Sequence, residues 1–166
     1  MTCLKLRNVF ISIFIAGALL GCANEGVSPD TNIDSWSVSQ GSYDGKVLFV
    51  RRNEGIKPWV GSPSYPYRLG IAIPFHRPNE HGLPSREEAQ LVGEIEDRLD
   101  ATLKETKTVF ALVLTTAGMR EFVFYTADPE VVRSKVEAIR AQVKTYDVQY
   151  YLREDLQWAV YQSFSG

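Results

Sequence analysis

The sequence predicts a single α+β domain built around an antiparallel sheet, and three observations favour that class. Residues 108–126 read TVFALVLTTAGMREFVFYT, two β-rich runs separated by a break that contains glycine, which is typical of a β-hairpin. Two segments before and after this hairpin have apolar residues at helical spacing. The chain has 166 residues, of which 45% are hydrophobic and 23% charged, as expected for one globular domain.

The first segment has the pattern of a secretion signal. Lys5 and Arg7 precede an apolar run at 9–20, which is too short to span a bilayer but has the length of a signal-peptide core. The run ends in Leu-Leu-Gly-Cys at 19–22, which resembles the lipobox that bacterial lipoprotein signal peptidase cleaves. The alternatives are an ordinary secretory signal and an uncleaved anchor.

The lipobox resemblance implies that residues 1–21 are a lipoprotein signal peptide and that the thiol of Cys22 carries lipid, palmitate among the acyl chains. The protein would then be held on a membrane without a spanning helix, since two or three acyl chains anchor stably where one does not. In a Gram-negative bacterium, Ala23 rather than Asp after the lipidated cysteine implies the outer membrane, with the domain facing the periplasm.

The mature chain is mildly acidic. Loss of the signal leaves 16 Lys and Arg residues against 20 Asp and Glu residues, without a basic cluster, so we expect no nucleic-acid partner. Cys3 leaves with the signal and Cys22 is lipidated, so we expect no disulfide. Residues 22–35 are polar and aperiodic, which predicts a flexible tether, and the folded domain is predicted at 36–166 from Trp36 onward.

Strands and helices alternate along this domain. We predict strands at 46–52, after a turn at Asp44-Gly45, at 67–73 and at 147–153, with a loop at 53–66. Ser85 and Glu88 fit a capping box that begins a helix ending near Lys104. Asp128 and Pro129 begin a second helix, and a short C-terminal helix starts at Asp155.

From Tyr67 the predicted order is β-α-β-β-α-β, the ferredoxin-like pattern of two split βαβ units. Right-handed crossovers place both helices on one face of the antiparallel sheet. The extra N-terminal strand at 46–52 must then lie at an edge, or the topology differs.

The central hairpin predicts a second apolar face. With 117–118 as the loop, Thr116 lies opposite Met119, and counting back gives the pairs Val113–Phe122 and Ala111–Phe124 on one side and Leu112–Val123, Phe110–Tyr125 and Leu114–Glu121 on the other. If the helices cover the first side, the second is an interaction face made of Phe110, Leu112, Glu121, Val123 and Tyr125. The alternatives are a cover made by Trp158 and Tyr161 or by the loop with Trp59, and self-association.

Other polar groups carry weaker signals. His76, Glu80 and His81 share a loop, but their spacing fits no metal motif, so we expect no metal site and no cofactor. Glu94, Glu96, Asp97 and Asp100 are expected on the wet side of a helix rather than in catalysis, unless one is buried against Arg120. Arg120 and Glu121 must point to opposite faces of a strand, and a structural salt bridge is the favoured role of Glu121.

Several segments together resemble the bacterial domain of unknown function 695 family, over residues 36 to about 164. The family-motif residues are Gly82, Pro84, Glu96, Asp97, Gly118, Arg120, Glu121, Asp155, Trp158 and Tyr161. Relatives joined to a domain like an inhibitor of RNase E imply binding rather than chemistry. We therefore expect a membrane-anchored envelope lipoprotein that acts as a non-enzymatic protein-interaction module, with an envelope protein or a second copy as partner. A small-ligand-binding or enzymatic periplasmic domain, with its pocket beside the Trp59 loop, is the alternative.

Overall fold

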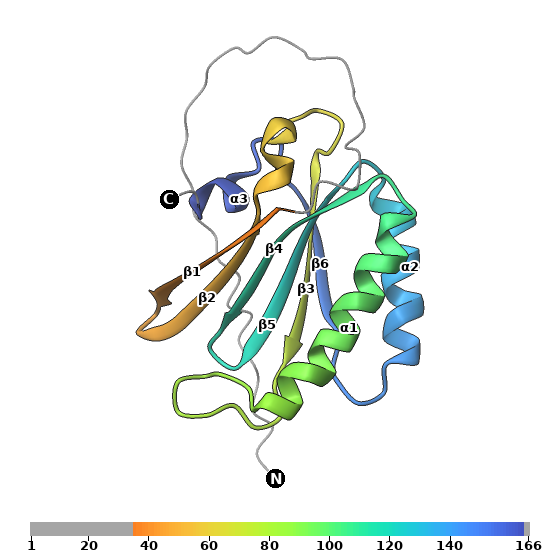
Figure 1. The fold of residues 1–166 in the computed structure, drawn as a ribbon. Coiled ribbons are helices and arrows are strands. Elements are labelled where there is room, and N and C mark those ends of the chain that lie inside the picture. The colour runs from red at the N-terminus through yellow and green to blue at the C-terminus, as the bar shows by residue number, and fades with distance from the viewer. Residues whose placement is uncertain (1–34, 165–166) are drawn as a thin grey trace.

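The computed structural model describes residues 35–164 (Figure 1). The predicted signal peptide at 1–21, the lipidation site Cys22 and nearly all of the tether at 22–35 lie outside the described residues. Within residues 35–164, none of the helices has the length and apolar character needed to cross a membrane.

The domain is a mixed α and β structure with one six-stranded antiparallel sheet. Its elements are β1 (Trp36–Tyr43), β2 (Lys46–Asn53), the 3-10 helix η1 (Glu54–Trp59), β3 (Tyr67–Pro74), α1 (Arg86–Lys104), β4 (Thr108–Thr116), β5 (Met119–Thr126), α2 (Pro129–Gln142), β6 (Gln149–Glu154) and α3 (Ala159–Ser163). The strands lie in the order β1-β2-β4-β5-β3-β6, and each neighbouring pair is antiparallel. Helices α1 and α2 lie side by side on one face, as Figure 1 shows.

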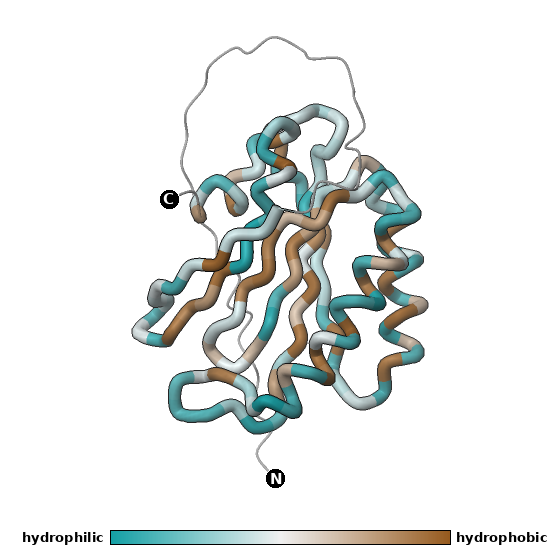
Figure 2. The backbone as a smooth tube through the Cα atoms, viewed as in Figure 1, coloured by the Kyte–Doolittle hydropathy of each residue, from teal (hydrophilic) through white to brown (hydrophobic). Residues whose placement is uncertain are grey.

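Both long helices begin at the residues that the sequence predicts. The Ser85 side chain accepts a hydrogen bond from the Glu88 N–H, and that of Asp128 accepts one from the Val131 N–H. These bonds satisfy backbone donors that the first helical turn leaves free. The apolar stripes of the helices pack on the sheet. The buried residues of this helix-side core are Leu69, Ile71, Ile73, Phe75, Val92, Ile95, Leu99, Leu103, Val113, Phe122, Phe124, Val132, Val136, Ile139, Tyr146 and Val148. Figure 2 shows hydrophobic backbone along the central strands and hydrophilic positions recurring along both helices.

Strand β1 is an element that the sequence did not predict. It pairs along its whole length with β2, through a turn in which Asp44 and Gly45 have φ of 47° and 72°. Two positive φ values are those of a type I′ hairpin turn, for which Asp-Gly is favoured. Most side chains of β1 are exposed, so the strand has no buried alternating face by which to recognise it. Strand β2 therefore lies between β1 and β4, so of the two alternatives that the sequence left open, an edge position for this strand does not hold.

The predicted register of β4 and β5 is confirmed for half of its length. Thr116 to Leu112 pair with Met119 to Val123 as counted, but the register then shifts between Phe110 and Leu112. Phe110 pairs with Phe124 rather than with Tyr125, so the predicted pairs of Phe110 and Ala111 are wrong. A bulge adds one residue to a strand, and the sequence hides it because both faces are apolar here. Phe110 consequently turns to the helix side, where its ring stacks on Phe124 at 4.3 Å.

The C-terminal segment covers the second face of the sheet. Its buried cluster contains Leu48, Val50, Val109, Ala111, Leu112, Leu114, Val123 and Tyr125 from the sheet, Ile56 and Tyr65 from the η1 region, and Trp158 and Tyr161. Asp155 does not begin a helix as predicted, because Trp158 has a left-handed conformation with φ of 54° and α3 starts only at Ala159.

Candidate functional site

Arg120 and Glu121 are adjacent on β5 and centre two charged clusters on opposite sides of the sheet. Arg120 pairs with Thr115 across the hairpin, and Glu121 pairs with Leu114. Neighbouring residues of a strand point to opposite faces of the sheet. The interaction partners of Arg120 and Glu121 lie on opposite sides, as expected for two residues that cannot serve one site. The partners of Arg120 come from α1 and β4, whereas the hydrogen-bond partner of Glu121 comes from β6.

The helix-side cluster joins Glu96 to two arginines. Arg51 Nη1 donates to Glu96 Oε1 at 2.8 Å, and Arg120 Nη1 lies 4.0 Å from Glu96 Oε2. Arg120 Nε also donates to Thr115 Oγ1 at 3.2 Å. The Arg51 guanidinium lies 5.1 Å from the centre of the Trp36 ring. The family-motif residues Glu96 and Arg120, distant in sequence, are thus brought together.

Burial dominates the electrostatics of this cluster. It lowers the pKa of Arg120, the Glu96 carboxylate raises that pKa, and the second guanidinium of Arg51 lowers it further. Glu96 is buried, whereas Glu94 and the motif residue Asp97 are exposed on the same helix. Of the four acids expected on the wet side, Glu96 is the exception that the expectation allowed for, an acid buried beside Arg120. A carboxylate held between two arginines ties α1 to β2 and β5.

The second cluster links Glu121 to Tyr151. Tyr151 on β6 extends over Gly70 of β3, and its hydroxyl donates to Glu121 Oε1 at 2.7 Å. Burial raises the pKa of the Glu121 carboxyl, while the hydrogen bond from Tyr151 and the charge of Arg68 lower it. Burial also raises the pKa of the Tyr151 hydroxyl, as does the nearby Glu121. Glu121 therefore accepts a hydrogen bond from a tyrosine, whereas the sequence favoured a salt bridge to a basic residue.

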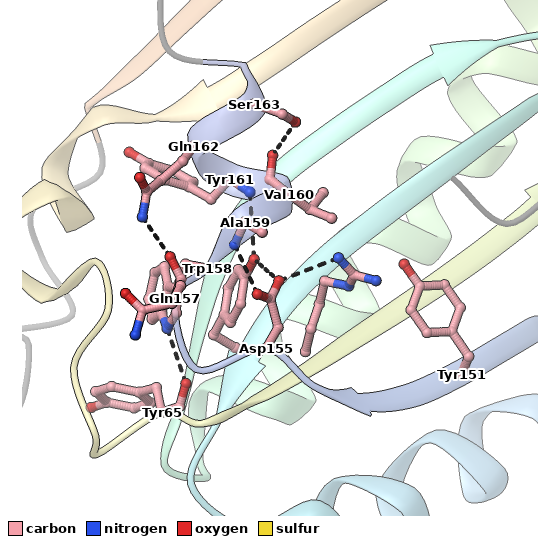
Figure 3. Close-up of polar contacts among 12 residues, drawn as sticks. Tyr65, Tyr151, Asp155, Gln157, Trp158, Ala159, Val160, Tyr161, Gln162 and Ser163 are labelled. Atoms are coloured by element: carbon pink, nitrogen blue, oxygen red, sulfur yellow. Dashed lines mark hydrogen bonds and ion pairs between the residues drawn. The ribbon is translucent and has the colours of Figure 1, made fainter. Parts of the chain in front are cut away.

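Asp155 is the polar centre of the cover over the second face (Figure 3). Its Oδ2 accepts a hydrogen bond from the Tyr125 hydroxyl at 2.9 Å and from Arg68 Nη1 at 3.2 Å. Its Oδ1 accepts from the Ala159 N–H at 2.8 Å. The side chains of Arg68 and Asp155 are only 10% and 9% exposed, so this is a buried ion pair. A buried charge needs its partner, and each of these two residues therefore fixes the other.

Trp158 and Tyr161 complete the cover. The Trp158 ring stacks on Tyr125 with centres 3.9 Å apart, and its Nε1 donates to the Tyr65 carbonyl at 3.0 Å. The Tyr161 hydroxyl donates to the Asn53 carbonyl at 2.7 Å. The motif Asp155-x-x-Trp158-x-x-Tyr161 therefore holds the end of the chain against the sheet.

The predicted interaction face is buried at its centre. Leu112, Val123 and Tyr125 are fully buried, so the expectation of an open face is wrong for them. Phe110 packs on the helix side because of the bulge in β4, and Glu121 is half-buried beside Tyr151. The alternative prediction, a cover made by the C-terminal segment, describes these contacts.

Gly82 and Gly118 join a loop to the central hairpin. The Gly118 N–H donates to the Gly82 carbonyl at 2.9 Å, and the Phe75 N–H donates to the Gly118 carbonyl at 2.7 Å. Gly82 has φ of +77°, and a Cβ there would lie 3.0 Å from the backbone of Ala117. The half-buried Pro84 follows in the same loop, just before the cap of α1. These motif residues serve close backbone packing.

The two histidines, His76 and His81, contact different residues. The His76 ring stacks on Tyr146 at 4.4 Å, and the His76 N–H donates to the buried Glu88 carboxylate at 2.5 Å. His81 Nε2 lies 3.6 Å from Glu80 Oε1 on the exposed loop. Residues 35–164 contain no group of three or more His, Cys, Asp or Glu side chains placed to hold a metal ion.

Strand β1 is an exposed edge of the sheet. Among residues 35–164 it has one neighbouring strand, β2, and its sequence WSVSQGSY has neither a charged residue nor proline. Val38, the third residue of the strand, is 70% exposed. The opposite edge, β6, carries the exposed charged residues Arg153 and Glu154. The two edges therefore differ in the features that normally prevent strand addition.

Comparison with known proteins assigns the domain. No curated protein and no solved structure matches the chain. The model of a family described as a family of unknown function (DUF695) matches residues 34–165, which is most of the chain and includes every element of the structure. The chain therefore belongs to the DUF695 family of unknown function.

Proposed function

We propose that this protein is a lipid-anchored protein-interaction module of the cell envelope, and that it binds its partner along the outer edge of β1. The observation that carries the proposal is an eight-residue edge strand without charge or proline. Such a strand offers a row of backbone N–H and C=O groups to an extended segment of another chain. Natural sheets usually protect an edge of this length with lysine, proline or a bulge.

The rest of the second face supports a binding role at the edge rather than a pocket. The space beside the Trp59 loop, where the alternative function requires a ligand pocket, is filled by the buried side chains of Ile56, Tyr65 and Trp158. Trp59 itself packs against the same cluster. A small ligand would have to displace these side chains to reach the sheet.

The anchoring part of the proposal rests on the lipobox resemblance at 19–22. Two or three acyl chains on Cys22 would hold the protein on the membrane, and the predicted tether at 22–35 has a random-coil reach of about 20 Å. The tether ends where β1 begins. The proposed binding edge would therefore work close to the membrane surface.

We also infer that the elements from β3 to β6 form a ferredoxin-like unit to which β1 and β2 are added beside β4. The pairing of β3 with both β5 and β6 supports this inference, as does the position of α1 and α2 on one face. In this arrangement the added hairpin extends the sheet beyond the helix layer. Within residues 35–164, the buried residues of the helix-side core include none from β2, and the hairpin reaches this side through Trp36 and the Arg51–Glu96 ion pair.

The test is site-specific photo-cross-linking in living cells with the full-length chain. A photoreactive residue at Val38 should give a defined cross-linked product in the membrane fraction, and one at Leu156, which is also exposed, should not. Adding Ser37→Lys in the same chain should abolish the product, because a charged side chain opposes pairing at an edge. Cys22→Ser should release the protein from the membrane. A Val38 product that survives Ser37→Lys would overturn the edge-binding proposal, as would the absence of any product.

A further inference from the structure

We propose that the strand that pairs with β1 is β1 of a second copy of this chain, so that two sheets join in a two-fold dimer. The inference rests on the proposed function, because it names the partner of the same edge. The two strands run antiparallel about an axis perpendicular to the sheet. Such an isologous contact is the commonest way in which identical chains associate.

The charge pattern of β1 favours a copy of itself as partner. Antiparallel self-pairing within 36–43 places uncharged residues of this strand opposite uncharged residues of its copy. No like charges are then brought together, whereas like charges directly opposite each other destabilise a strand pair. A charged partner strand would find no opposite charge on β1 itself. Strand β6, in contrast, contains the charged residues Arg153 and Glu154.

The exposure of Val38 selects the register. Trp36, Val38 and Gln40 alternate along the strand and lie on one side of the sheet. A two-fold axis at Val38 pairs this side chain with Val38 of the partner and pairs Trp36 with Gln40 of the partner. At 70% exposure, Val38 is more exposed than any other large hydrophobic side chain in residues 35–164. This register buries it against an identical aliphatic group.

The charged residues of β2 do not oppose this dimer. Arg51 lies opposite Val38 on β2 and is bound to Glu96. In a joined sheet, the two copies of Arg51 are three strand spacings apart, about 14 Å. That distance exceeds the Debye length of about 8 Å at physiological ionic strength, so the repulsion between them is largely screened.

The attachment points of the two tethers also fit. With the axis at Val38, the two copies of Trp36 are four residues apart along the paired strands, about 14 Å at 3.4 Å per residue. Both tethers then leave the dimer from neighbouring points, and each has a reach of about 20 Å. Two lipid-anchored copies can therefore pair while attached to one membrane. Confinement to a membrane raises their effective concentration.

The experiment is disulfide cross-linking of the full-length protein in membranes. Val38→Cys, treated with a mild oxidant, should give a product of twice the mass of the mature chain, and a reductant should reverse it. Leu156→Cys and the unmodified chain, treated in the same way, should stay monomeric. Ser39→Cys should cross-link at least tenfold more slowly, because residue 39 lies on the other side of the sheet and is not opposite itself in this register. Val38→Lys should remove the dimer from detergent extracts measured by light scattering, while circular dichroism stays unchanged.

The outcomes separate this inference from the proposed function. If the photoreactive residue at Val38 captures a different polypeptide and Val38→Cys stays monomeric, the dimer is overturned and binding at the β1 edge stands. A homodimer that is unaffected by Val38→Lys, or one that cross-links best through Ser39→Cys, would also overturn the inference. If neither probe gives a product at position 38, both proposals fail.

Discussion

The ring of Tyr151 lies over Gly70, in the space that a side chain at that position would fill. A Cβ on Gly70 would stand 2.3 Å from two ring carbons of Tyr151, a distance that real Cβ contacts do not show. Glycine at this position is therefore what allows a tyrosine on β6 to reach across β3 and bond to Glu121 on β5. The hydrogen bond adds a side-chain link between β6 and β5 that passes over β3.

Replacement of Gly70 by alanine should consequently destabilise the domain. We expect Gly70→Ala to lower the free energy of unfolding by about 1–3 kcal/mol, as extra atoms in a packed site generally do, when measured by urea denaturation. Gly93→Ala is the matched control, since nothing lies within 4 Å of a Cβ there and the residue is inside α1. This control should gain about 0.5–1 kcal/mol from helix propensity. Equal effects of the two substitutions would contradict the packing of Tyr151 on Gly70.

The buried ion pair of Arg68 and Asp155 should be sensitive to loss of one partner. Asp155→Asn leaves the Arg68 charge buried without its counter-charge, and we expect a loss of about 3–5 kcal/mol in the free energy of unfolding. Arg68→Met together with Asp155→Asn should recover a large part of that loss, because no uncompensated charge then remains. A double-mutant cycle measures the coupling between the two residues. Strictly additive effects would show that the pair does not interact.

Glu121 should make stability depend on pH. Its folded pKa is raised by burial above the ordinary value of 4.5, so the folded protein holds this proton more tightly than the unfolded chain does. The contribution of Glu121 is therefore fully favourable below about pH 4.5 and is lost as the pH rises through the folded pKa.

Glu121→Gln removes the titrating group, so the stability that Glu121 loses at high pH is no longer lost. The glutamine side chain keeps an oxygen that can accept a hydrogen bond from the Tyr151 hydroxyl. We expect the variant to exceed the unmodified protein in stability at pH 7, and the difference to shrink as the pH is lowered toward 4.5. Urea denaturation at a series of pH values checks this. The exposed Glu94→Gln is the control and should show no such trend. A constant difference across the series would mean that Glu121 does not titrate in this range.

The helix-side cluster should depend on Glu96 rather than on its neighbour Asp97. Glu96→Gln removes the charge that Arg51 and Arg120 share, and we expect it to lower the free energy of unfolding by about 1.5–3 kcal/mol. Asp97→Asn, on the exposed side of the same helix, should stay within about 0.5 kcal/mol of the parent. Thermal unfolding followed by circular dichroism compares them. Similar losses in both variants would point to helix propensity as the cause.

Local chemistry accounts for the parts of the fold that the sequence predicted correctly. The caps at Ser85 and Asp128 satisfy free backbone donors within three residues, so their signals lie close together in the chain. The register of the hairpin next to its turn is likewise fixed by the short loop at 117–118. These features need no knowledge of distant segments.

The misassigned parts depend on contacts between distant segments or on weak patterns. The sequence gives no sign of the bulge between Phe110 and Leu112, because both faces of the strand are apolar there. The predicted register therefore placed Phe110 on the wrong side of the sheet. Strand β1 lacks a buried face, although the turn at Asp44 and Gly45 could have indicated it. The partner of Glu121 depends on the order of β5, β3 and β6, which pattern alone does not give.

The cover formed by Trp158 and Tyr161 comes from residues that follow all six strands of the sheet in sequence. A chain that stops early, through a nonsense codon or a frameshift, lacks Asp155 as well and leaves Arg68 without its counter-charge. Such a product displays a bare aromatic and aliphatic surface, the kind that chaperones and proteases recognise. The segment at 155–161 thus decides whether the second face of the sheet is buried or exposed.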